Sequence, residues 1–141
     1  MNDHVDFAFL ADGAEAINGK LYVMGGAFDT IWTNAVPLTY PKISFAMRLI
    51  FSSAELERKH KLEISVINED GKPITAIVGG DLEISRNPNV PKGWKHGFLT
   101  VINLANLKFP DFGDYSFEVV LNNSSVKSVG LRVARSVQFQ S

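Results

Sequence analysis

The sequence predicts an all-β protein, an antiparallel β-sandwich of the immunoglobulin-like type with about eight strands. The first observation is a strict alternation of apolar and polar residues near the carboxyl end. Because successive side chains of a strand point to opposite faces, this alternation buries one face and leaves the other in water. The second observation is a series of strand-length segments separated by turn residues, with at most one short helical turn between them.

Two rows of apolar residues define the last pair of predicted strands. They are Tyr115, Phe117, Val119 and Leu121 in the first strand and Val129, Leu131 and Val133 in the second. The rows share a face only if the connection has an odd number of residues, because a slip of one residue would turn one row outward. Residues 123–125 are predicted as this loop, since Asn123 tolerates a left-handed backbone.

The segment before these strands has the spacing of a tyrosine corner. Leu104, Leu107 and Phe109 precede the run 110–115, which ends in Tyr115. In a tyrosine corner, the hydroxyl of a Tyr near the start of a strand bonds the backbone a few residues upstream. We therefore expect the Tyr115 hydroxyl to hold this connection.

The amino-terminal half begins with a predicted β-hairpin, in which strands 5–16 and 21–32 flank Asn18-Gly19. This dipeptide is typical of a type I′ turn, because both central residues need positive φ. Gly25-Gly26 is interpreted as a bulge or a close backbone approach. A regular ladder would place Phe9 opposite Phe28, Phe7 opposite Thr30 and Val5 opposite Trp32, with Leu21 and Val23 against Ala14 and Ala16 on the other face.

The middle of the chain predicts further strands. Residues 42–51 form a half-buried strand, and Ser52 with Glu55 has the spacing of a capping box that starts one helical turn. Strands 61–68 and 74–85 follow, the second bent at Gly79-Gly80. Residues 86–96 are the longest irregular connection, and a short strand at 98–103 comes after it.

Length and composition predict a single domain over residues 1–141. The net charge of -1 argues against a nucleic-acid binder and against a polybasic membrane contact. The chain has no cysteine, no apolar run long enough to span a membrane, and acids near the amino terminus where a secretory signal has basic residues. We therefore expect a cytoplasmic protein.

No motif predicts catalysis, a metal site or a cofactor. The three histidines are far apart in sequence, and no Cys or His stands at ligand spacing. His96, in the irregular connection, is the candidate for an enzymatic hypothesis that pairs it with a carboxylate, while His4 and His60 are interpreted as surface residues.

Aromatic residues at predicted strand ends and in loops give the remaining candidates. They either close the ends of the core or contact a ligand or partner. A sugar or other small ligand would use Trp94 and its loop. Since the first hairpin is apolar on both faces, one of them needs cover. We therefore favour a binding or assembly module that forms a homodimer or contacts another protein. The possible contact residues are Trp94, His96, Trp32, Tyr40 and Phe28.

Several segments together resemble a family of small bacterial proteins of unknown function. They are Ala11-Asp12, residues 19–26 with Phe28-Asp29, residues 61–64, residues 70–73, and residues 103–107 leading to 113–117. These are strand and turn signatures, so the resemblance implies a β-sandwich. The family also implies a bacterial or phage origin and an intracellular single domain. It implies no activity and no catalytic residue.

Overall fold

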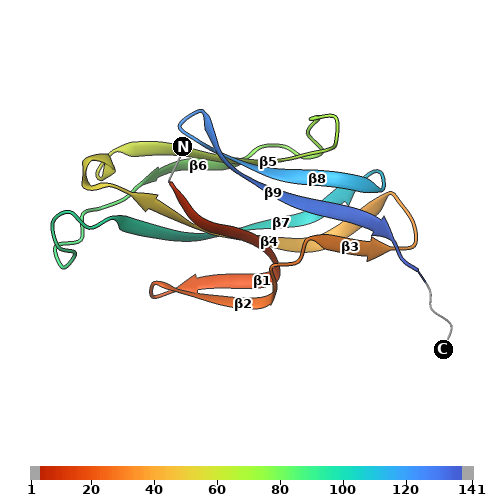
Figure 1. The fold of residues 1–141 in the computed structure, drawn as a ribbon, viewed down its shortest axis with the longest axis horizontal. Coiled ribbons are helices and arrows are strands. Elements are labelled where there is room, and N and C mark those ends of the chain that lie inside the picture. Colours follow the sequence, from red (N-terminus) through yellow and green to blue (C-terminus); the bar gives the residue numbers. More distant parts are fainter. Residues whose placement is uncertain (1–3, 138–141) are drawn as a thin grey trace.

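A computed structural model describes residues 4–137 of the chain (Figure 1). It contains strands and one 3₁₀ turn, η1 (Ser53–Glu55). The strands are β1 (Val5–Ile17), β2 (Lys20–Gly26), β3 (Thr30–Thr33), β4 (Leu38–Phe51), β5 (Lys59–Ile67), β6 (Val78–Glu83), β7 (His96–Phe109), β8 (Gly113–Leu121) and β9 (Ser124–Arg135).

The strands form two sheets, with the order β2-β1-β4-β7 in one and β3-β9-β8-β5-β6 in the other. All neighbouring strands are antiparallel except β3 and β9, which run parallel. The prediction of an all-β sandwich is confirmed. The strand count is higher than expected because the segment predicted as one strand over 21–32 divides into β2 and β3, which belong to different sheets.

The core lies between the sheets and follows the alternation of β4 and β8. Every second residue of β4 from Ile43 to Phe51 is fully buried, as are Phe117 and Val119 of β8. The rings of Phe45 and Phe117 stack across the interface with their centroids 5.9 Å apart. Burying aromatic side chains of this size contributes most of the hydrophobic stabilisation of such a domain.

The connection between β8 and β9 differs from the predicted loop. Asn122 and Asn123 form a two-residue turn, both with positive φ, and Leu121 lies opposite Ser124. The register then shifts, so that Val119 lies opposite Lys127. The extra residue that the shared face requires is therefore a β-bulge in β9 and not part of the loop.

The tyrosine corner is confirmed. The Tyr115 hydroxyl donates to the Asp111 carbonyl at 2.7 Å and accepts from the Asp111 N–H at 3.1 Å. Burial is the main cause that raises the pKa of Tyr115, so the phenol stays protonated and keeps its donor.

The first hairpin is partly as predicted. Asn18 and Gly19 both have positive φ, as a type I′ turn needs, and the ladder runs from Ile17↔Lys20 to Ala11↔Gly26. The predicted partners of Val5, Phe7 and Phe9 are wrong. Positive φ at Gly25 and Ala27 turns the chain away from β1, so Phe28 and Trp32 leave this sheet. Phe7 and Phe9 lie opposite Arg48 and Ala46 of β4 instead.

Two other predicted strands have different limits. Of the predicted strand 74–85, only Val78–Glu83 forms a strand, β6. Gly79 lies so close to β5 that a Cβ there would be 2.0 Å from the Leu62 carbonyl oxygen. The short strand 98–103 is part of β7, which pairs with β4 from Phe51↔His96 to Leu38↔Phe109. The helical turn expected after Ser52 is confirmed as η1.

Candidate functional site

The β1–β2 hairpin projects from the sandwich, with β2 as the outermost strand (Figure 1). Its apolar side chains are unusually exposed: Met24 is 77% exposed, Tyr22 56% and Ile17 45%. Together with Val23, they are four of the eight exposed large hydrophobic residues in residues 4–137. Contiguous exposed apolar surface on a soluble domain marks a contact site more often than scattered apolar residues do.

The ladder determines which hairpin side chains share a face. Met24 lies opposite Gly13, and Tyr22 lies opposite Glu15. Residues two apart on a strand project on the same side, so the Tyr22 and Met24 side chains are neighbours on one face of β2. No aromatic ring or large aliphatic chain from β1 covers Met24, because its partner is a glycine.

A groove separates the hairpin from the body of the sheet. β1 leaves β4 after the pair Ala11↔Ser44, and a space of about 460 Å³ opens beyond it. The groove is lined by Gly13, Ala14, Glu15, Tyr22, Val23 and Met24 of the hairpin, with Lys42 of β4 and Asn103 of β7. At the base of the hairpin, Tyr40 of β4 donates to an Asp12 carboxylate oxygen at 3.4 Å. Burial, helped by Asp12, raises the pKa of Tyr40, which keeps this donor in place.

The predicted contact residues do not form one site. Trp32 on β3 is 64% exposed and Trp94 in the β6–β7 connection is 63% exposed. Figure 1 shows β3 and the β6–β7 connection toward opposite ends of the molecule. Phe28 and Tyr40 are half-buried and pack against the core. Phe112, another loop aromatic, lies under the Arg135 guanidinium at 4.7 Å.

The histidines depart most from the sequence-based interpretation. His96 is the first residue of β7, not a loop residue, and is 8% exposed. Both of its ring nitrogens are buried and lack a hydrogen-bond partner among residues 4–137. The predicted pairing of His96 with a carboxylate is therefore not seen in the described part of the chain.

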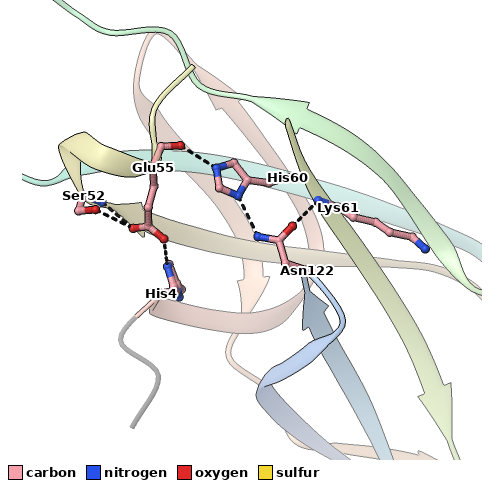
Figure 2. A network of polar contacts seen from close by, with 6 residues as sticks. All are labelled: His4, Ser52, Glu55, His60, Lys61 and Asn122. Carbon is pink, nitrogen blue, oxygen red and sulfur yellow. Dashed lines mark hydrogen bonds and ion pairs between the residues drawn. The ribbon is translucent and has the colours of Figure 1, made fainter. Parts of the chain in front are cut away.

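A carboxylate pairs with His4 instead (Figure 2). The His4 Nε2 and a Glu55 carboxylate oxygen are 2.5 Å apart. The other Glu55 oxygen accepts the Ser52 N–H at 2.9 Å and the Ser52 hydroxyl at 3.0 Å. Partial burial alone would raise the pKa of Glu55, but the Ser52 and His4 hydrogen bonds outweigh it and lower that pKa.

His60 belongs to the same network but is buried, contrary to the surface position expected for it. Asn122 accepts the Lys61 N–H through Oδ1 at 2.9 Å, which directs its amide nitrogen to His60 Nδ1, also at 2.9 Å (Figure 2). His60 Nδ1 must then accept, and Nε2 donates to the Glu55 carbonyl at 2.7 Å. The ring is a structural bridge between the β8–β9 turn and η1.

The acidic surface near the tyrosine corner offers no free ligand set. A groove of about 210 Å³ is lined there by residues that include Glu69, Asp111 and Asp114. Glu69 already accepts the Asp114 N–H at 2.8 Å, and Asp114 pairs with Arg132 at 2.9 Å. Within residues 4–137, no three or more acidic or histidine side chains are placed to hold a metal ion.

Comparison with known families decides the classification. Residues 6–134 match the family model described as "Family of unknown function (DUF6941)". The chain belongs to this family. Membership in DUF6941 confirms the expected resemblance to a family of unknown function. No curated protein matches the chain.

A solved structure similar to this DUF6941 chain is a β-glucuronidase from glycoside hydrolase family 2, with 13% sequence identity and a TM-score of 0.33. The match covers 70% of this chain and 10% of that chain, so the chain spans about a tenth of its length. A likeness this weak carries no argument about the DUF6941 chain. In the described residues, no helix has the length and apolar character to cross a bilayer.

Proposed function

We propose that this domain is a non-catalytic assembly module that forms a homodimer through the β1–β2 hairpin. The observation that supports the proposal is the exposure of Ile17, Tyr22, Val23 and Met24 on one projecting element. Tyr offers a large rigid ring with a polar end, and Met adapts to irregular surfaces, so both suit a protein contact.

The sequence left open whether a homodimer would form through a sheet edge or through one of the two apolar faces of the first hairpin, and one of these faces was made of Val5, Phe7, Phe9, Phe28 and Trp32. That face does not exist, because the last two residues lie outside the β2-β1-β4-β7 sheet. Phe7 and Phe9 are half-buried and stack on each other at 5.8 Å. The proposal therefore rests on the hairpin alone.

The composition supports a proposal about location. A chain without cysteine suits a reducing compartment, and we place the domain in the bacterial cytoplasm. Fractionation of cells that express the tagged natural chain tests this. Recovery from an extracytoplasmic fraction would contradict it.

The assembly proposal is tested by measuring mass in solution. Wild-type protein should sediment as a dimer in the micromolar range. Met24→Lys should sediment as a monomer, because the lysine places charge in the contact. Since the core is intact, its thermal midpoint should equal that of the wild type at a concentration low enough that association contributes little. Ile77→Lys is the matched control, since Ile77 is 62% exposed and lies outside the hairpin. A wild-type monomer throughout this range would overturn the proposal.

Trp94 supports a second candidate function, the binding of a carbohydrate or another small ligand. Its exposed indole, in the irregular connection before β7, could stack on a sugar ring. Glycan-array screening followed by tryptophan fluorescence titration tests it. Binding should disappear in Trp94→Ala and persist in Trp32→Ala. If no glycan on the array bound the protein, carbohydrate binding would be contradicted.

A further inference from the structure

We propose that β2 pairs with β2 of a second copy of this chain, antiparallel and centred on Tyr22, so that two sheets join into one. This inference rests on the proposed homodimer and specifies its contact. The β2 strand is at the end of its sheet, and no strand among residues 4–137 pairs with its outer edge. Such an edge presents unpaired backbone groups that bind another strand readily.

The hairpin ladder determines which backbone groups face outward. Across a two-residue turn, Ile17 and Lys20 form a hydrogen-bonded pair, and the bonded pairs then alternate along the ladder. Lys20, Tyr22 and Met24 thus direct their N–H and C=O groups toward β1. Leu21 and Val23 direct theirs away from it, to the free edge.

One register uses these groups fully. Gly25 has a φ of +60, so the extended part of β2 is 20–24 and its midpoint is Tyr22. In an antiparallel pairing about that midpoint, Leu21 of each copy bonds Val23 of the other through both backbone groups. The contact is self-complementary under a two-fold rotation, as a closed homodimer requires.

Side chains and charges agree with this register. Tyr22 meets its own copy, and Lys20 lies opposite Met24, whose thioether can pack along the aliphatic part of the lysine. Glu15 lies behind Tyr22 in its own hairpin, so the two copies never place like charges directly opposite each other. On the reverse face, Leu21 packs beside Val23 of the other copy.

The other sheet edges are less suited to this pairing. The β3 edge has only four residues, and β6 carries Asp81 and Glu83. The β7 edge is longer, but Asn106 with its φ of +52 interrupts the extended run. Short, charged or interrupted edges resist strand addition. The 20–24 segment has one charge, that of Lys20 next to the turn.

Cysteine cross-linking tests the register cleanly, since the chain has no native cysteine. In the proposed pairing, Tyr22 and its copy form a non-hydrogen-bonded pair with Cα atoms about 4.5 Å apart, within disulfide reach. After oxidation, Tyr22→Cys should run mostly as a covalent dimer on a non-reducing denaturing gel. Leu21→Cys and Val23→Cys should run as monomers with or without reductant. In the proposed pairing, the Cα atoms of the two Leu21 residues, and those of the two Val23 residues, lie more than about 7 Å apart, which is too far for a disulfide.

A second variant keeps Tyr22 in the contact. Lys20→Cys combined with Met24→Cys should cross-link, and neither single substitution should, because only the pair 20 with 24 is directly opposite. Each variant must retain the wild-type thermal midpoint. Cross-linking of Leu21→Cys or Val23→Cys alone would overturn the register. A dimer by sedimentation that no variant cross-links would overturn strand pairing and leave the proposed homodimer standing. A wild-type monomer would overturn both.

Discussion

The β1–β2 and β8–β9 hairpins share the same local chemistry and have different surroundings. Both turn through two residues with positive φ, Asn18-Gly19 in one and Asn122-Asn123 in the other. The β8 strand buries every second side chain in the core, whereas β2 buries none. The turn therefore decides that a hairpin forms, and the pattern along the strands decides whether it enters the core.

The two hairpins also differ in register, because β9 contains a bulge. Without the register shift next to Val119, the rows on β8 and β9 would face opposite ways. The β1–β2 ladder has no shift between Ile17↔Lys20 and Ala11↔Gly26, and it carries apolar residues on both faces. The β8–β9 hairpin has a single buried face, whereas the β1–β2 hairpin leaves apolar side chains exposed, and we propose that these form a contact.

The largest expected contrast comes from removing an aromatic ring from each hairpin. Phe117→Ala should lower the free energy of unfolding by about 3 to 5 kcal/mol, because a fully buried ring leaves a cavity. Tyr22→Ala should change it by no more than about 0.5 kcal/mol. Urea denaturation measures both, at a protein concentration low enough that association contributes little. Similar losses in the two variants would contradict the distinction.

The tyrosine corner sharpens the comparison, since it secures the entry to β8. Tyr115→Phe should cost about 1 to 3 kcal/mol, because Asp111 loses bonds from both its N–H and its carbonyl. Tyr22→Phe is the matched control, because Tyr22 is 56% exposed and should lose little stability. An unfolding midpoint of Tyr115→Phe equal to the wild type would show that the corner does not stabilise the fold.

The two turns themselves can be separated by Asn→Ala substitutions. Alanine suffers a similar penalty for positive φ at Asn18 and Asn122. Only Asn122 also bonds the Lys61 N–H and His60. Asn122→Ala should therefore cost about 1 kcal/mol more than Asn18→Ala in chemical denaturation. Equal costs would mean that the His60 bridge adds no net stability.

The smallest effect concerns pH and the network that the β8–β9 turn joins. The pKa of Glu55 is lower in the folded state than in the unfolded chain. Its contribution to stability is thus present above the unfolded pKa, near 4.3, and is lost as pH falls through the folded value. The stability difference between wild type and Glu55→Gln should shrink below about pH 4. A difference that stays constant from neutral to acidic pH would contradict this assignment.

Local signals made much of the fold predictable. Asn18-Gly19, the row from Tyr115 to Leu121 and the spacing to Asp111 each depend on a few neighbouring residues, and each is confirmed. The departure of β3 was not predictable, because its partner β9 lies about a hundred residues away and Ala27 gives no sign of its positive φ. The burial of His60 and His96 likewise depends on distant strands.

The candidate site was only partly visible in the sequence. Apolar residues on both faces of the predicted hairpin of strands 5–16 and 21–32 indicated that one face needs cover, and the structure leaves Ile17, Tyr22, Val23 and Met24 exposed. The aromatic candidates differ in exposure, because ring type alone does not determine position. Phe28 packs against the core, while Trp32 a few residues later is exposed. Which of the two rings is covered depends on how β3 pairs with β9, far away in the sequence.

The crossing of the chain from β2 to β3 also has a mechanical consequence. The hairpin is joined to one sheet through β1 and, by way of Gly25 to Asp29, to the other sheet through β3 and its parallel ladder with β9. A force applied to the hairpin is therefore divided between both sheets. A second subunit bound at the proposed hairpin contact would therefore be connected to both sheets.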